Sequence, residues 1–155
     1  MSELKARLQG DLTEAMRRRD EVATATLRMV LTAVTTEEVA GAVARELTDA
    51  EVVGVLRKEA KKRRESAEAY DGAARPELAA RERAELEVLG DYLPAELSDV
   101  ELVGLVAAAV EEAKGQGAEG PRAMGAVMKL VQPRVAGRAD GARVAAEVRR
   151  ALGAT

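Results

Sequence analysis

The chain has 155 residues, with 24 Lys and Arg against 27 Asp and Glu, and it contains no Cys, His, Trp or Phe. The missing Cys excludes disulfides, zinc fingers, thiol nucleophiles and iron–sulfur clusters, and the missing His removes the commonest general base. Charged residues make up 33 % of the chain, and no apolar run approaches the roughly 20 residues of a membrane-spanning helix. The N-terminal residues lack the apolar segment of a secretory signal, so we expect a cytoplasmic protein without a membrane partner.

The first half of the chain has the apolar periodicity of helices and no sustained strand pattern. Leu4, Leu8, Leu12 and Met16 recur every four residues and predict a helix that begins after Ser2. A second helix is expected over residues 21–43, with Met29 in its apolar band. Thr48 and Glu51 fit a capping box that opens a third helix, which we expect to run to about residue 70.

Two charged residues lie on the apolar side of this third predicted helix. Glu59 and Arg63 are four residues apart, in the order that favours an ion pair. We therefore predict an internal pair, which specifies geometry more than it adds stability.

The second half of the chain contains a break and then three more predicted helices. A fourth helix runs over residues 76–91, and Pro94 then interrupts the pattern, because the residue before a proline avoids the α region. We place the domain boundary there. Because the pattern is helical on both sides of it, we predict an all-α fold, with an N-terminal helical bundle over residues 1–93 and a small helical tail domain over residues 94–155. Ser98 and Glu101 form a second predicted capping box. A helix then runs to Gly115, the next lies between Pro121 and Pro133, and the last follows Asp140.

A basic cluster on the third predicted helix is the first candidate binding face. Its five members fall within about one half of the helix circumference: Arg57, Lys58, Lys61, Lys62 and Arg64. This second basic face suits a phosphate backbone or an acidic protein surface. The alternative is an ordinary solvated face opposite a core stripe.

The sixth predicted helix carries the other candidate face. Arg122, Gly125 and Lys129 share the side opposite a stripe of Met and Val residues. A glycine in a helix interior costs about 1 kcal/mol relative to Ala, and this cost is best tolerated where something must approach the backbone. Two bases around a glycine therefore suit the binding of a phosphate or a ribose. Arg134 and Arg138 extend this basic face beyond the helix. The alternative is that Gly125 and Gly137 permit tight helix–helix packing.

The sequence contains no recognisable catalytic motif. No glycine-rich loop has the ending of a phosphate-binding loop, and the paired carboxylates point to different helix faces. We expect no catalytic residues, no metal site and no cofactor.

Several segments in one order carry a family resemblance. They are Leu27–Val30, Arg57–Ser66, Tyr92–Ser98, Met124–Met128 and Gly137–Gly141. With them the chain resembles the YqeY-like family, which is similar to the C-terminal helical and tail region of one of the subunits of the bacterial aspartyl/glutamyl-tRNA amidotransferase. The resemblance implies an all-α fold, a tail similar to a module that docks tRNA, and an association with glutamine-dependent carbon–nitrogen ligases whose chemistry lies in parts absent from this chain. This sequence departs from the family pattern at Ala136, where Lys is common, and at Leu130, where Gly is usual.

Two functions follow from these features. The first is a tRNA-binding module that recognises RNA shape, which needs no aromatic side chains. Its predicted contacts are Arg122, Gly125, Lys129, Arg134, Gly137, Arg138 and Arg143. The second is a protein–protein adaptor of an amidotransferase or synthetase complex, which would use the second basic face or the acidic zone over residues 77–112.

Overall fold

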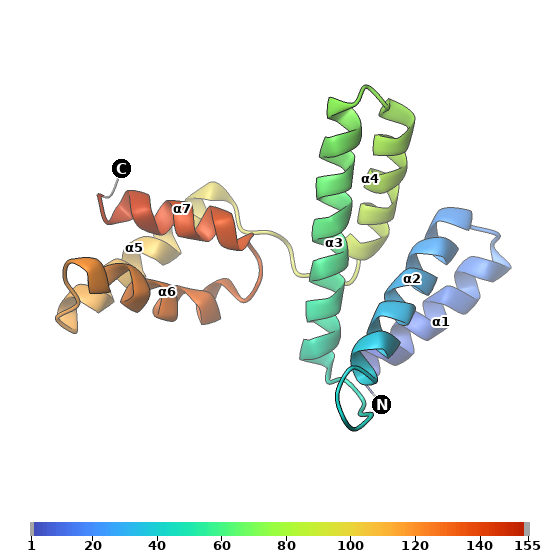
Figure 1. Cartoon of the computed structure of the whole chain (residues 1–155), viewed down its shortest axis with the longest axis horizontal. Coiled ribbons are helices and arrows are strands. Elements are labelled where there is room, and N and C mark those ends of the chain that lie inside the picture. The colour runs from blue at the N-terminus through green and yellow to red at the C-terminus, as the bar shows by residue number, and fades with distance from the viewer. Residues whose placement is uncertain (1, 154–155) are drawn as a thin grey trace. The chain divides into compact units, whose positions relative to one another are not determined.

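The structure is a computed structural model that describes residues 2–153 (Figure 1). The described residues form seven helices and no strands, which confirms the all-α prediction. The helices are α1 (Glu3–Arg17), α2 (Glu21–Glu38), α3 (Asp49–Gly72), α4 (Pro76–Gly90), α5 (Asp99–Gly115), α6 (Pro121–Val135) and α7 (Gly141–Ala151). No helix within residues 2–153 is long and apolar enough to cross a membrane.

The chain divides into two compact units between Leu93 and Pro94. Helices α1–α4 form the N-terminal unit, and α5–α7 form the tail unit. Tyr92 holds the end of the N-terminal unit against α1, because its hydroxyl donates to the Asp11 carboxylate and the Arg7 guanidinium lies 4.5 Å from the ring centre. Burial and the neighbouring Asp11 carboxylate raise the pKa of the Tyr92 hydroxyl above its ordinary value.

The N-terminal unit consists of two helical hairpins, α1 with α2 and α3 with α4 (Figure 1). Helix α3 packs against α1 and α2, and α4 packs against α2. The largest fully buried side chains of this unit are Leu8, Val30, Val34, Val52, Leu56 and Leu89. The core is therefore aliphatic, as the composition requires.

Helix α2 ends at Glu38, so the expected end at residue 43 was wrong. The Glu38 carboxylate accepts a 2.7 Å hydrogen bond from Lys5 Nζ and a 3.2 Å bond from the Leu47 backbone N–H. These two bonds, the one from Lys5 being the stronger, lower the pKa of Glu38. They also hold the chain after α2 in a non-helical path back towards α1, a tertiary constraint that local periodicity does not contain.

Two methionines that the periodicity placed in the core are exposed instead. Met16 is 42 % exposed and Met29 is 51 % exposed. Their sulfur atoms are contacted by arginines, Met16 Sδ by Arg28 at 3.2 Å and Met29 Sδ by Arg63 at 3.5 Å. The expectation was wrong because the neighbours of these sulfur atoms are arginine guanidinium groups, and both side chains remain open to water.

Both predicted capping boxes are confirmed. The Thr48 hydroxyl accepts from the Glu51 N–H at the start of α3, and the Ser98 hydroxyl accepts from the Glu101 N–H at the start of α5. In each case the glutamate side chain accepts a bond from the cap residue's backbone N–H. These helix starts are local, which is why sequence alone located them.

The predicted Glu59–Arg63 pair is confirmed, and it belongs to a larger buried cluster. Arg63 is 3 % exposed and Glu59 is 5 % exposed, with Arg63 Nη1 lying 3.5 Å from Glu59 Oε2. Glu85 of α4 is the third member, since Arg63 Nε donates to its Oε2 at 3.2 Å. One arginine thus joins α3 to α4 between two carboxylates.

We expect Arg63→Met to destabilise the N-terminal unit by about 3 kcal/mol, because it removes the shared counter-charge of two buried carboxylates while conserving side-chain volume. The loss stays at the lower end of the range for broken buried pairs, since Lys62 still lies 3.2 Å from Glu59 and Arg81 lies 3.2 Å from Glu85. Urea unfolding followed by far-UV circular dichroism measures this change. Lys61→Ala is the control, since Lys61 is exposed and its change in stability is expected to stay within about 0.5 kcal/mol. A loss below about 1 kcal/mol for Arg63→Met would contradict the importance of the cluster, given the range for broken buried pairs.

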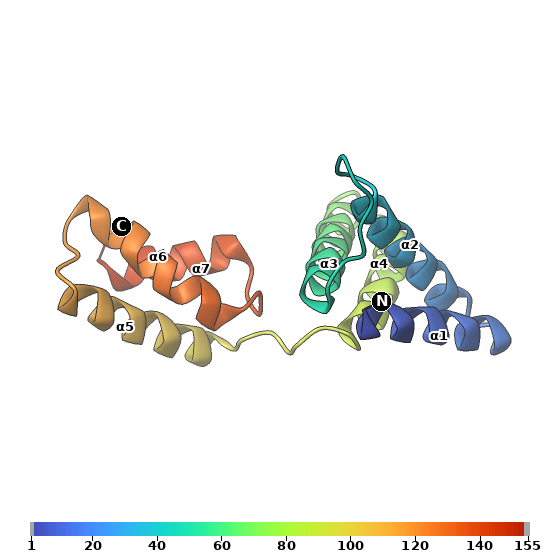
Figure 2. The ribbon, with the colours of Figure 1, turned by 90° about the horizontal axis from the view of Figure 1, so that it is seen from below.

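The tail unit has three helices, with α5 packed against both α6 and α7 (Figure 2). Its largest fully buried side chains are all valines: Val106, Val127, Val131, Val135, Val144 and Val148. Helix α6 continues through Pro133 to Val135, so the expected end at Pro133 was wrong. Pro133 has no N–H, and its helical position leaves the Lys129 carbonyl without its usual intrahelical donor. Both residues are exposed, so water can reach this carbonyl.

Candidate nucleic-acid interface

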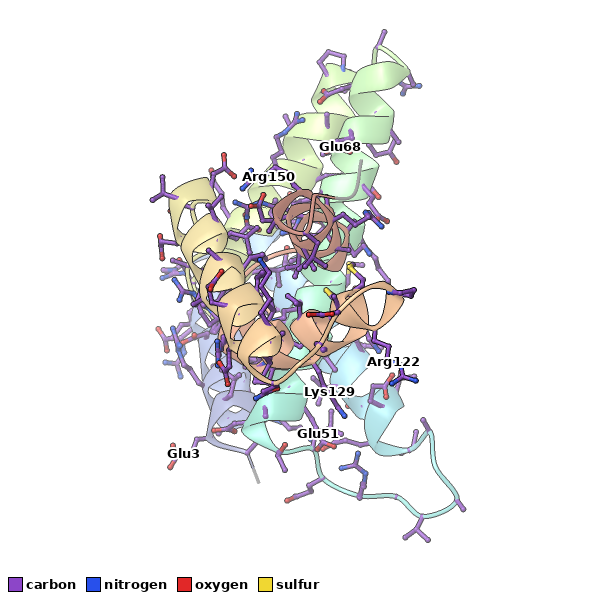
Figure 3. All side chains as sticks on the ribbon, turned by 90° about the vertical axis from the view of Figure 1, so that its left-hand side faces the viewer. Glu3, Glu51, Glu68, Arg122, Lys129 and Arg150 are labelled. Carbon is purple, nitrogen blue, oxygen red and sulfur yellow. The ribbon has the colours of Figure 1, made fainter. Side chains whose placement is uncertain are left out.

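The outer face of α6 presents three of the predicted site residues. Arg122, Gly125 and Lys129 are exposed, whereas Val127 and Val131 on the opposite side are fully buried. Figure 3 shows the Arg122 and Lys129 side chains extending from this helix. Two turns of helix separate these two residues, which corresponds to about 10 Å along the axis.

Neither cation on this face has a partner in the described part of the chain. Arg122 and Lys129 form no hydrogen bond or ion pair with residues 2–153. Their positive charges are therefore uncompensated by direct contacts, and no intramolecular bond must break before a ligand binds.

Gly125 lies between them with open space around it. A Cβ atom placed there would meet no other atom within 4 Å, and the residue has no positive φ. The alternative role of Gly125 in tight helix–helix packing is therefore wrong. What remains is a stretch of helix on which the backbone can be approached closely.

Gly137 has a different role, which is conformational. It has φ 72° and follows Ala136 with φ 48°, so two successive left-handed residues turn the chain out of α6. A residue with a Cβ is disfavoured in this region, which explains the glycine without reference to a ligand.

Arg138 and Arg143 tie the turn after α6 and the start of α7 to the segment before α5. Arg138 Nε donates to the Ala95 carbonyl at 2.9 Å, and the Leu97 N–H donates to the Arg138 carbonyl at 2.8 Å. Arg143 donates to the Leu97 carbonyl at 2.9 Å and to Asp99 Oδ1 at 2.7 Å. We call this set of bonds the arginine clasp.

Two further ion pairs belong to the same region. Arg138 Nη2 lies 3.6 Å from Glu101 Oε2, and Arg134 Nη2 donates to the Glu112 carboxylate, which joins α6 to α5. The pKa of Glu101 is lowered mainly by hydrogen bonds from the Ser98 hydroxyl and backbone N–H, and further by the Arg138 charge. Three of the seven predicted RNA contacts thus have intramolecular partners.

Sequence reasoning missed these partners, although one signal pointed to them. Residues 94–98 are outside any helix, so their backbone groups need partners from elsewhere. Arginines with several donors near the next turn are suitable suppliers. Which arginine meets which carbonyl depends on how α5 and α7 pack, and spacing in the sequence does not give that.

Asp140 is the N-cap of α7 by position, but its side chain makes no capping hydrogen bond.

The second basic face belongs to the N-terminal unit, on α3. Lys58, Lys61 and Lys62 are exposed, and Arg57 and Arg64 are half-buried. Lys62 Nζ lies 3.2 Å from the buried Glu59 carboxylate, and Lys61 Nζ lies 4.0 Å from Glu65. The face exists on the surface as predicted from helical geometry, with part of its charge offset by neighbouring carboxylates.

The described residues contain no group of three or more Asp or Glu side chains placed to hold a metal ion.

Residues 5–152 match the family described as Yqey-like protein. The chain belongs to the YqeY-like family. It is also similar to the protein named Altered inheritance of mitochondria protein 41, mitochondrial, of Pyrenophora tritici-repentis, with 31 % identity over 153 residues. That alignment covers 96 % of this chain and 80 % of the fungal protein. The similarity therefore extends over both units of the chain.

Arg143→Ala removes the arginine that holds both the Leu97 carbonyl and the Asp99 carboxylate. We expect the tail unit to lose about 1–2 kcal/mol, the lower part of the range for charged hydrogen bonds, because the side chain is partly exposed. Hydrogen exchange of tail amides in the full chain measures this loss. Arg149→Ala, which removes an arginine with no partner among residues 2–153, is the matched control and should leave exchange unchanged. Equal protection in both variants would contradict the clasp.

Gly125→Ala tests the openness of the α6 face. The new methyl group meets no neighbour, and Ala is favoured over Gly in a helix, so stability should rise by about 0.5–1 kcal/mol. Thermal unfolding and tail hydrogen exchange report the change. A fall in stability would instead mean that the glycine permits close packing.

Proposed function

We propose that this member of the YqeY-like family is a helical module that binds tRNA through the outer face of α6 and has no active site of its own. The observation that carries the proposal is the pair of cations, Arg122 and Lys129, that lack partners among residues 2–153 and lie on either side of the open backbone at Gly125. The family's resemblance to the tail region of the amidotransferase subunit supports it further. In such a role the carbon–nitrogen ligase chemistry associated with the family belongs to a partner enzyme.

In this proposal RNA is recognised by shape and charge. Arg122 and Lys129 bind two phosphates, and the exposed helix backbone at Gly125 lets a ribose approach between them. Contacts to phosphates and 2′-hydroxyls suffice for such recognition, so the scarcity of aromatic residues is no obstacle. The region from residue 122 to residue 150 contains seven basic residues and two acidic ones, which favours an approaching polyanion.

The other predicted contacts take a positioning role. Arg134, Arg138 and Arg143 have intramolecular partners, and their side chains are 33–36 % exposed. They hold α6 against α5 and fix the turn that contains Gly137. Each guanidinium has five N–H donors, so some remain for a phosphate at the edge of the RNA-binding face.

We expect labelled bulk tRNA to bind the purified chain, with affinity that falls linearly on a log–log plot against salt. The variant Arg122→Ala with Lys129→Ala should bind at least tenfold more weakly, because two phosphates are no longer neutralised. Its salt slope should be shallower by about 0.7–0.9 for each of these phosphates. Fluorescence anisotropy at several salt concentrations measures both quantities.

The matched control removes two other cations of the tail unit, Lys114→Ala with Arg149→Ala. It makes the same change in net charge at residues that are not on the α6 outer face. An equal loss in both double variants would mean that only net charge matters. No binding to the wild-type chain at low salt would remove the tRNA proposal.

The alternative is a protein–protein adaptor in an amidotransferase or synthetase complex. The exposed lysines of the second basic face, Lys58, Lys61 and Lys62, favour it, because they offer an acidic partner a surface in the N-terminal unit. A complex that survives ribonuclease treatment and is abolished when these three lysines become Glu would favour the adaptor. The expected cytoplasmic location stays a prediction under either function.

A further inference from the structure

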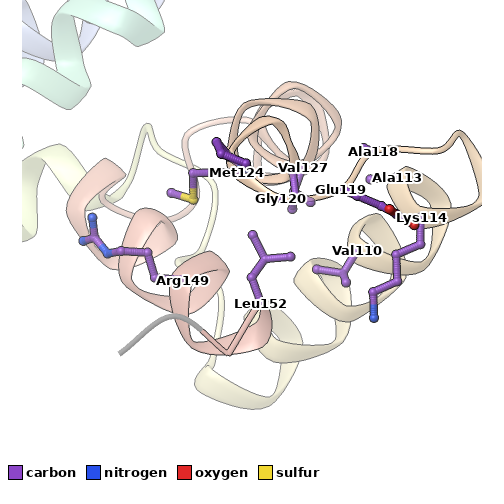
Figure 4. A pocket seen from close by; sticks show the side chains of 12 residues that line it. Val110, Ala113, Lys114, Ala118, Glu119, Gly120, Met124, Val127, Arg149 and Leu152 are labelled. Carbon is purple, nitrogen blue, oxygen red and sulfur yellow. The ribbon is translucent and has the colours of Figure 1, made fainter.

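A hollow of about 690 Å³ lies within the tail unit (Figure 4). It is bounded by the C-terminal part of α5, the loop and first turns of α6, and the C-terminal part of α7. Its volume falls within the range of about 300–1,000 Å³ that is typical of small-molecule sites in proteins.

The residues that line the hollow become more exposed from its floor to its rim. Val110, Ala113 and Val127 form a fully apolar floor and are 5 %, 1 % and 0 % exposed. Met124 and Leu152 are half-buried walls. An apolar floor with apolar walls favours an apolar ligand body, because its burial removes hydrocarbon surface from water on both partners.

The hollow exists because the surrounding side chains are small. Ala113, Ala118, Gly120 and Ala123 face it at places where larger residues would close it. The chain has no Phe or Trp to fill such a space. The small side chains of the tail unit thus leave room between the ends of α5, α6 and α7.

The rim is charged, with two cations against one acid. Figure 4 shows Lys114 and Arg149 on opposite sides of Leu152, with Glu119 near Lys114. Arg149 has no hydrogen bond or ion pair among residues 2–153, and Lys114 approaches the exposed Glu111 at 4.0 Å. Pairs this exposed contribute little, so both cations are available to an anion.

We propose that this hollow binds a small amphiphile with an apolar body and one anionic head group, of the chemical class of a medium-chain carboxylate. The hydrocarbon part covers Val110, Val127 and Leu152, and the carboxylate pairs with Arg149 or Lys114 at the rim. The first turn of α6 reaches the same rim and contains no acidic residue, so its positive end also favours an anion. A cationic head group meets two like charges there against the single opposite charge of Glu119.

This site is separate from the proposed RNA face. Arg122, Gly125 and Lys129 do not line the hollow. Either proposal can therefore fail without the other, and the double variants used for tRNA serve here with their roles exchanged.

The test is calorimetric titration of the full chain with decanoate and with decylamine, which share a chain length and differ in head-group charge. We expect decanoate to bind at least tenfold more tightly than decylamine. In Lys114→Ala with Arg149→Ala, this preference should fall below about threefold, whereas Arg122→Ala with Lys129→Ala should keep the wild-type preference. Equal binding of the two amphiphiles to the wild-type chain, or no binding of decanoate, overturns the proposal.

A filling variant locates the bound ligand. Ala123→Leu adds volume to the wall of the hollow and should weaken decanoate binding at least tenfold, with Ala142→Leu on the exposed side of α7 as the control. Circular dichroism checks that both variants fold. Amide chemical-shift changes in the wild-type chain give a second measurement that does not depend on any variant. They should concentrate at Val110, Ala113, Val127 and Leu152, and changes confined to the N-terminal unit overturn the proposal.

Discussion

The hydrogen bonds between residues 95–99 and the turn after α6 decide which arginines of the tail unit have intramolecular partners. Leu97 donates its N–H to the Arg138 carbonyl, and Arg138 and Arg143 donate back to the carbonyls of Ala95 and Leu97. The segment before α5 has no helix of its own to satisfy these groups, and a core of valines and alanines supplies none. The arginines in the clasp therefore stabilise the fold through these hydrogen bonds. Arg122, Lys129 and Arg149 have no partner among residues 2–153, and they are the tail cations for which a binding role is most economical.

The N-terminal unit applies the same principle deeper in its core. Arg63 lies between Glu59 of its own helix and Glu85 of α4, and all three residues are buried. Such a cluster adds less stability than apolar packing of equal volume, but it tolerates few other alignments of α3 on α4. In a chain with few large side chains, this polar cluster and the arginine clasp provide directional contacts that small aliphatic residues lack.

Helix α6 contributes to both proposed binding sites, one on each of its two sides. Its outer side carries Arg122, Gly125 and Lys129, and its inner side contributes Met124 and Val127 to the hollow. The helix interior contains a glycine and a proline, both unfavourable there, and both are exposed. Packing therefore does not explain them, whereas an open backbone, with a Lys129 carbonyl that lacks its usual helical donor, is consistent with a ligand on that side.

The sequence alone determined the helical class, the capped starts of α3 and α5, the Glu59–Arg63 pair and the composition of the α6 outer face. Each of these depends on residues within one or two turns of each other, where spacing fixes geometry. Tertiary structure decided what depends on distant contacts: the end of α2 at Glu38, held by Lys5 and Leu47, the exposure of Met16 and Met29, and Glu85 as the third member of the buried cluster. It also decided which arginines have partners and where a hollow remains. These features arise from segments that are 9 to 46 residues apart and meet only when the helices pack, so no local pattern in the sequence encodes them.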